Sequence, residues 1–165
     1  MLYTIGYEGT NIDNFLTTLR NSGVTVLVDV RAVPLSRKKG FSKSRLKEAV
    51  EAAGITYIHL RELGAPREVR NNLKATGDWQ DYVHHYEAHL TTQHEALTRL
   101  AHQVQNTEVC LMCFEADPLT CHRSLISKEL EKRKVVPKTS HLQVSAAFPV
   151  KASDAPTPQL PVAFA

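Results

Sequence analysis

The chain has 165 residues, of which 42% are hydrophobic and 22% charged, as expected of one globular domain with a substantial core. The formal net charge of +3 permits an anionic partner without requiring one. Three cysteines exclude a disulfide scaffold, and no apolar run approaches the roughly 20 residues of a membrane span. Because the N-terminus also lacks the pattern of a signal peptide, we expect a cytoplasmic protein without a membrane partner.

Strands and helices alternate along the first part of the chain. The apolar, partly β-branched runs predict strands over Leu2–Ile5, Val24–Val30 and Ile55–Leu60. Between the first two runs, Thr10 and Asp13 resemble a capping box that begins a helix. Between the second and third, a basic loop marked by Pro34 and Gly40 leads to Ser42. Ser42 is placed to cap another helix, which ends before Gly54.

The second part continues this alternation after a long connection. Arg61–Gly77 has no clear periodicity and is predicted to be irregular, and Asp78 caps one long helix whose apolar residues run from Trp79 to Leu100. The remaining predicted elements are a strand over Val109–Phe114, a helix over Pro118–Arg133 and a short edge strand over His141–Val144.

This alternation predicts an α/β fold, a single Rossmann-like three-layer domain with a mainly parallel sheet of about four to five strands flanked by helices. The predicted domain covers residues 1–144. Residues 145–165 are rich in Pro and Ala without periodicity, and they are predicted to form a disordered tail. In parallel sheets, ligands bind beyond the carboxyl ends of the strands, so the residues that follow each strand are the candidates for a site.

Polar residues follow every predicted inner strand. The candidates are Tyr7 and Glu8 after the first strand, Asp29 and Arg31 after the second, His59 after the third, and Cys113, Glu115, Cys121, His122 and Arg123 around the end of the fourth. The segment from Arg31 to Lys47 contains seven basic residues and no acidic one. It also carries Ser36, Arg37 and Phe41, which suits contact with phosphate and stacking on a base.

The segment from Val109 to Ser127 carries the densest chemistry. A helix N-terminus lowers the pKa of a nearby thiol and attracts anions, so Cys121 is a candidate nucleophile. The spacing excludes a phosphatase loop, which needs Arg six positions after the Cys, because Ser127 stands there. Cys113, Cys121 and His122 alternatively form three ligands for zinc or another transition metal. Both thiols also suit a structural role, whereas Cys110 is interpreted as structural only.

Four segments together resemble a known bacterial and archaeal family. They are YTIGYEG at Tyr3–Gly9, DVRAVPLSRKKGFSKSRL at Asp29–Leu46, HLRELGAP at His59–Pro66 and CFEADPLTCHRS at Cys113–Ser124. Their order and spacing resemble the family described as domain of unknown function 488 (DUF 488), over roughly residues 2–143. The resemblance implies this domain extent and supports the residues singled out above, but it implies no settled activity.

The leading hypothesis is an enzyme, a hydrolase or transferase, that acts on a phosphate-bearing nucleotide or nucleic acid. Its anion-binding residues are Arg31, Arg37 and Arg123, its acid or base is Asp29 or Glu115, and its nucleophile or proton donor is Cys121 or His122; Tyr7, Glu8, Ser36 and His59 complete the substrate contacts. One alternative is a metal-binding or metal-sensing protein that uses the Cys and His ligands. The other is a non-catalytic nucleic-acid-binding module that uses the basic loop.

Overall fold

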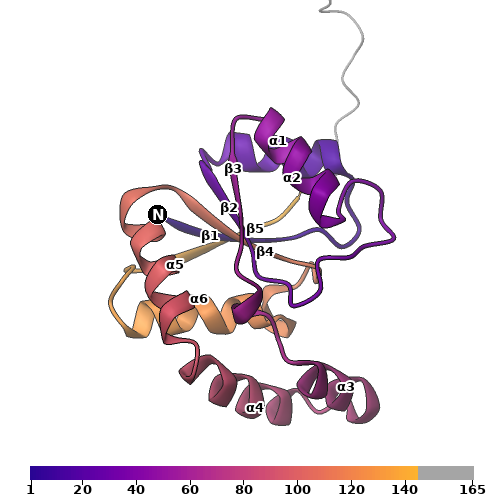
Figure 1. The fold of residues 1–165 in the computed structure, drawn as a ribbon, viewed down its shortest axis with the longest axis vertical. Helices are drawn as coiled ribbons and strands as arrows, with labels where there is room; N and C mark the ends of the chain where they lie inside the picture. Colours follow the sequence, from indigo (N-terminus) through magenta and orange to yellow (C-terminus); the bar gives the residue numbers. More distant parts are fainter. Residues whose placement is uncertain (145–165) are drawn as a thin grey trace, which may run out of the picture.

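A computed structural model describes residues 1–144 as a single sheet of five parallel strands with helices on both faces (Figure 1). The strands are β1 (Leu2–Gly6), β2 (Val26–Asp29), β3 (Thr56–His59), β4 (Val109–Cys113) and β5 (Thr139–Leu142). They lie in the order β3-β2-β4-β1-β5, and every pair is parallel. The predicted α/β class and parallel sheet are confirmed. The predicted disordered tail, residues 145–165, lies outside the described residues.

Six helices cover the two faces of the sheet. They are α1 (Ile12–Asn21), α2 (Lys43–Ala52), α3 (Arg67–Thr76), α4 (Trp79–Thr91), α5 (His94–Asn106) and α6 (His122–Lys132). Apolar residues of α1 and α2 form one core with one face of the sheet, and those of α4, α5 and α6 form a second core with the other face. Within residues 1–144, no helix is both long and apolar enough to cross a lipid bilayer.

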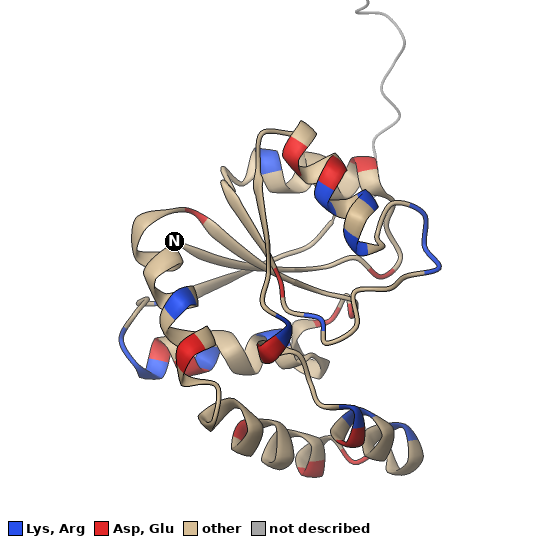
Figure 2. Cartoon of the chain, in the orientation of Figure 1, with Lys and Arg blue, Asp and Glu red and all other residues tan. Residues whose placement is uncertain are grey.

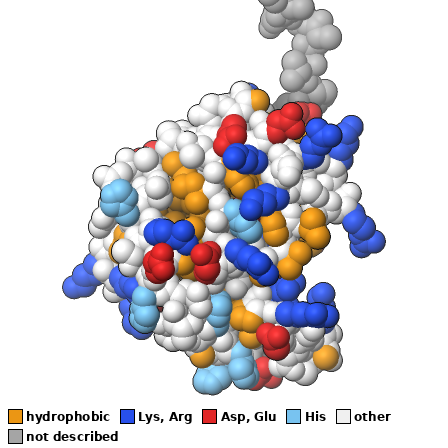
Figure 3. All heavy atoms as spheres, in the orientation of Figure 1, with side chains coloured by type: hydrophobic (Ala, Val, Ile, Leu, Met, Phe, Trp, Pro, Cys, Tyr) orange, Lys and Arg blue, Asp and Glu red, His pale blue; other side chains and the backbone are white. Residues whose placement is uncertain are grey.

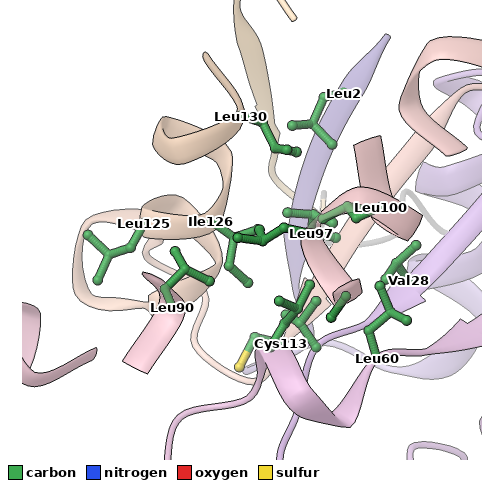
Figure 4. Packing of buried hydrophobic residues seen from close by; sticks show 14 of the residues in the cluster. Leu2, Val28, Leu60, Leu90, Leu97, Leu100, Cys113, Leu125, Ile126 and Leu130 are labelled. Atoms are coloured by element: carbon green, nitrogen blue, oxygen red, sulfur yellow. The ribbon is translucent and has the colours of Figure 1, made fainter. Parts of the chain in front are cut away.

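Strand β4 is central, and its side chains serve both cores because successive residues of a strand point to opposite faces. Cys110 and Met112 belong to the core under α1 and α2, whereas Leu111 and Cys113 belong to the core under α4 to α6. Cys110 and Cys113 therefore lie on opposite faces, as their odd separation predicts. Figure 4 shows Cys113 at the edge of its core, with the sulfur pointing away from Leu97 and Ile126.

The region between β3 and β4 differs from the sequence-based expectation. Arg61–Gly77 is not irregular, since it contains the 3₁₀ turn η1 (Arg61–Leu63) and the ten-residue helix α3. Helix α3 has no wide apolar stripe, and none of its residues is fully buried. The predicted long helix is two helices: α4 ends at Thr91 with Thr92 as its C-cap, and the hydroxyl groups of both residues donate to carbonyls of the preceding turn.

Other element ends are shifted by a few residues. The N-cap of α1 is Asn11 rather than Thr10, and its side chain accepts a hydrogen bond from the Asn14 amide at 2.9 Å. The predicted helix over Pro118–Arg133 begins with a separate 3₁₀ turn, η2 (Pro118–Thr120), and α6 starts only at His122. Asp117 caps η2, and Cys121 becomes the N-cap of α6.

The connections change direction at β4. The segments that follow β1 and β2 lead to α1 and α2 on one face of the sheet, whereas β4, which lies between those strands, leads to α6 on the opposite face. Adjacent strands whose connections leave in opposite directions form the usual ligand position of open parallel sheets. The residues after β4 and β2 are therefore the candidates for a ligand-binding site.

Candidate functional site

Two thiols, a carboxylate and an imidazole meet where β4 ends and α6 begins. The Sγ atoms of Cys113 and Cys121 both donate to Oε2 of Glu115, at 3.2 and 3.0 Å. The same sulfurs lie 3.7 and 3.9 Å from Nδ1 of His122. Cys113, Cys121 and His122 are buried and Glu115 is half-buried, so the carboxylate is the member of this group that reaches toward solvent. We call these four residues the thiol cluster.

The orientation of His122 is set by the backbone after β2. Its Nε2 lies 2.8 Å from the carbonyl oxygen of Val30, and because a carbonyl only accepts, Nε2 carries a proton. Nδ1 is thereby directed at the two sulfurs. The ring of Tyr86 packs edge-on against the imidazole with centroids 5.3 Å apart. The ligand atoms of Cys113, Cys121 and His122 all lie within 4.8 Å of one another.

The two thiols differ in acidity although they are neighbours. The hydrogen bond to Cys121, together with burial, holds the pKa of Cys113 well above its usual range. Burial opposes ionisation of Cys121 as well, but hydrogen bonds from Cys113 and His122 and the nearby charges of His122 and Arg123 bring its pKa well below the usual range. Of the two thiols, Cys121 is therefore the one that ionises first.

The pKa values of Glu115 and His122 both depend on the charge of Cys121. Burial and the charge of Cys121 raise the pKa of Glu115, because a carboxylate beside a thiolate is a like charge. Burial lowers the pKa of His122, but the hydrogen bond and charge of Cys121 outweigh it and the net direction is upward. A thiolate and an imidazolium side by side can act as a nucleophile with its proton donor, and the same atoms can bind a thiophilic metal ion.

The turn that carries Glu115 is held from three sides. Arg123, 1% exposed, donates to the carbonyl oxygens of Glu115 and Ala116 and to Thr4 of β1. On the other side, the carboxylate of Glu8 accepts from the Ala116 amide at 3.0 Å. Gly6 lies so close that a Cβ there would overlap the Glu115 carbonyl. Arg123 and Glu8 thus shape the turn, and the guanidinium of Arg123 is engaged by protein acceptors.

Asp29 and Arg31 form a buried pair next to the thiol cluster. Nε and Nη2 of Arg31 donate to the two carboxylate oxygens at 2.9 and 2.7 Å, and Nη1 donates to the Tyr7 hydroxyl and the Phe41 carbonyl. Tyr57 donates to Asp29 at 2.6 Å. Burial opposes the charge of Arg31, but Asp29 raises its pKa further, and burial and then the charge of Asp29 raise the pKa of Tyr57.

The remaining sequence-predicted residues are distributed around this centre. Tyr7 stacks on Phe41 with centroids 4.4 Å apart, which ties the basic loop to β1. Ser36 shapes that loop, since its backbone amide and carbonyl both bond the Ser42 hydroxyl. Arg37 is exposed on the same loop, whose outer part is coloured blue for Lys and Arg in Figure 2. Nε2 of His59 bonds the Arg31 carbonyl at 2.9 Å.

Several residues around the site were not singled out from the sequence. Tyr57 and Tyr86 read as ordinary apolar positions, because only the fold brings them to Asp29 and His122. Gly6 and Gly64 are close-approach positions, and a Cβ at Gly64 would overlap the backbone of Ala32. The sequence signal for these two positions is the glycine within YTIGYEG and within HLRELGAP, because glycine often stands where another backbone segment approaches closely.

Comparisons with known proteins give a family and no named relative. The profile of the family described as Domain of unknown function DUF488 matches residues 11–130, which include the end of β2, the thiol cluster and most of α6. No curated protein matches the chain. No solved structure matches it either.

Proposed function

Since the chain belongs to the DUF488 family, whose description names no activity, we propose from the site alone that it is a metal-dependent hydrolase. In this proposal Cys113, Cys121 and His122 bind zinc, and Glu115 is the general base. The observation that carries it is the convergence of three ligand atoms within 4.8 Å of one another. Two thiols and one imidazole are a ligand set of known catalytic zinc sites.

The spacing of the ligand atoms supports a metal centre. Zinc lies about 2.3 Å from sulfur and about 2.0–2.1 Å from nitrogen, so tetrahedral S and N ligands are about 3.5 Å apart. The two sulfurs lie 3.7 and 3.9 Å from Nδ1 of His122, so a small contraction brings both to that spacing. The hydrogen bond from Nε2 to the Val30 carbonyl is the second contact that metal-bound histidines usually make.

The environment of Glu115 supports its role as base. Zinc at such a site activates water as a nucleophile near neutral pH. Binding requires both thiols to lose their protons, which removes the two hydrogen bonds that they donate to Glu115. The carboxylate, half-buried at the outer side of the cluster, is then free to accept a proton from water.

The metal site is tested by binding. Protein purified without a chelating tag is titrated with Co²⁺, whose thiolate charge-transfer absorption reports sulfur ligands, and zinc is then used to displace it. We expect one site, lost in Cys113→Ser, Cys121→Ser and His122→Ala and kept in Cys110→Ala, because Cys110 faces the other core. Equal binding by all four variants would contradict the proposal.

The role of Glu115 is tested separately. Glu115→Gln keeps the size of the side chain but cannot take a proton. We expect it to retain zinc and to lose hydrolysis of chromogenic phosphate and carboxylate esters by at least about 100-fold, a typical loss for a general base. Loss of zinc in this variant would make Glu115 a ligand instead, and unchanged hydrolysis would remove it from the reaction.

A second candidate function rests on the contact between Cys121 and His122. Cys121 is the N-cap of α6, and its sulfur faces Nδ1 of His122, an arrangement that suits a thiol nucleophile in a group-transfer enzyme. This candidate predicts that metal-free protein is alkylated by iodoacetamide at Cys121 much faster than at Cys113. Equal rates at the two thiols, or none at Cys121, would count against it.

A further inference from the structure

A hollow of about 700 Å³ lies between the loop after β2 and the segment from β3 to α3. Its polar lining comes from His59, Arg61, Glu62, Arg67, Arg70 and His89. Figure 3 shows this side of the molecule notched above α3, with Lys and Arg side chains at its border. We call it the basic groove. Its volume is within the range of about 300–1,000 Å³ that is typical of small-molecule sites.

The charges of the basic groove favour an anion. Three arginines face one carboxylate, and that carboxylate, Glu62, is paired outside the groove with Arg99 at 2.9 Å. Within residues 1–144, Arg61 and Arg67 make no side-chain hydrogen bond or ion pair. Arg70 uses only Nε, which donates to the Ala65 carbonyl at 3.1 Å. The guanidinium groups thus keep most of their donors for a ligand.

The start of α3 adds to this field. Pro66 and Arg67, its N-cap and first residue, line the groove, and no side chain caps the helix. The first amide groups of a helix have no partner within it and favour negative charge. Several arginines suit the multiple oxygens of a phosphate better than a single carboxylate, because each guanidinium can bond two oxygens at once.

The basic groove is joined to the thiol cluster through two short links. Two consecutive carbonyls after β2 each bond a different imidazole. The Val30 carbonyl bonds His122 of the cluster, and the Arg31 carbonyl bonds His59, which lines the groove. On the other side, the ring of Tyr86 lies between His122 and His89, at centroid distances of 5.3 and 6.0 Å. The Val30 and Arg31 backbone and the Tyr86 ring therefore connect the side chains of the groove to those of the cluster.

We propose that the basic groove binds the phosphate group of a small phosphate ester, of about the size of a nucleoside monophosphate. The identification of that ester as the substrate rests on the proposed hydrolase, whereas the binding itself does not. Arg61, Arg67 and Arg70 hold the phosphate oxygens. The substrate class is thereby a phosphate ester rather than a neutral ester or amide.

The test is calorimetric binding of AMP and of adenosine, which lacks the phosphate, to the intact protein at low ionic strength. We expect AMP to bind, inorganic phosphate to compete with it, and adenosine to show no heat. The variant Arg61→Ala/Arg67→Ala removes two exposed side chains and should weaken AMP binding at least about tenfold. Arg45→Ala/Lys47→Ala, which removes the same charge from α2, should leave it unchanged.

Four results would overturn the proposal, and three of them concern the small ligands. They are binding of adenosine as tight as that of AMP, equal loss in both double variants, and no binding of AMP or phosphate at all. A fourth is a thymidine oligonucleotide that binds far more tightly than AMP with a steep salt dependence, which assigns the surface to nucleic acid. The cobalt titration is independent of these outcomes, so a failed groove and a failed metal site are told apart.

Discussion

At the scale of single residues, Arg31 illustrates how a fold uses a cation that sequence analysis assigns to a ligand. A buried carboxylate is costly unless it is paired, and Asp29 is 0% exposed. Arg31 pairs with it through two charge-assisted hydrogen bonds, and its Nη1 donates to the Tyr7 hydroxyl and the Phe41 carbonyl. The pair therefore ties β2, β1 and the basic loop together beside the site.

We expect the variant Arg31→Met to be strongly destabilised. It leaves the Asp29 carboxylate buried without its cation, and breaking a buried pair in this way costs about 3–5 kcal/mol. The double variant Asp29→Asn/Arg31→Met removes the orphaned charge and should recover part of the loss. The free energy of unfolding from urea denaturation measures both. A loss below about 1 kcal/mol in the single variant would mean that the pair is dispensable.

Cys110 gives a second prediction at this scale. Burial alone raises its pKa, and its side chain is enclosed in the core under α1 and α2. In a Cys113→Ser/Cys121→Ser background, we expect no reaction of Cys110 with a disulfide reagent such as DTNB until the protein is unfolded, because the reactive form is the thiolate. Rapid reaction of the folded protein would show that this core opens.

The residues that sequence reasoning identified correctly as neighbours share one property: they are close in the chain. Cys113, Glu115, Cys121 and His122 lie within one strand-to-helix junction, and they do meet. The partners of Arg123 are different in kind. They include the backbone carbonyls of Glu115 and Ala116. Every residue has a backbone carbonyl, so the sequence does not indicate which one will bond a side chain. Predicting its role required the path of the turn.

At the scale of elements, the successes and errors follow from burial. Strand β4 is buried throughout and reads clearly as a strand. Helix α3 packs on α4 through only two large apolar side chains, half-buried Val69 and Leu73, so its apolar face is short and easily missed in the sequence. The division between α4 and α5 falls at Thr92, the C-cap of α4, and threonine occurs often enough within helices to hide such an end.

Two glycines give a matched prediction about how elements position the two sites. Gly6 at the end of β1 touches the turn of Glu115, and Gly64 after η1 touches Ala32 of the basic groove. A methyl group at either position forces the backbone apart. We expect Gly6→Ala to weaken cobalt binding with little effect on AMP, and Gly64→Ala to do the reverse.

Each of these two variants is the control for the other. Both should also lower the free energy of unfolding by about 1–3 kcal/mol, which is typical of overpacking, and urea denaturation measures that loss. If both substitutions reduce cobalt and AMP binding equally, they act by general destabilisation and the local interpretation is wrong.

At the scale of the whole molecule, the fold class was predictable from the alternation of strands and helices, but the strand order was not. Nothing in the periodicity requires β4 to insert between β1 and β2. That insertion reverses the direction of the connections at β4 and brings Val30, which follows β2, to His122, the first residue of α6. The site is therefore a product of topology, although most of its residues could be named beforehand.

The buried tyrosines predict a loss of stability in alkaline solution. Burial and then neighbouring negative charge raise the pKa of Tyr57 and Tyr82, and burial raises that of Tyr86. The folded pKa values lie above the unfolded value near 10, so the unfolded chain releases protons first as pH rises. Stability is thus fully present below about pH 10 and falls above it, by about 1.4 kcal/mol per pH unit for each group.

Urea denaturation between about pH 9 and pH 11 measures this slope, and tyrosinate absorbance follows the ionisation. The variant Tyr57→Phe should reduce the slope by the share of one group. A free energy of unfolding that stays constant up to pH 11 would contradict the expectation.

The alternation of β4 has one more consequence, which concerns the permitted length of the chain. Cys113 reaches the thiol cluster and Cys110 the opposite core only because each stands at the correct parity along the strand. Adding or deleting one residue between them inverts every side chain beyond the change. Insertions and deletions in this strand therefore keep Cys113 in the thiol cluster only in even steps, a rule that variants with lengthened strands would obey.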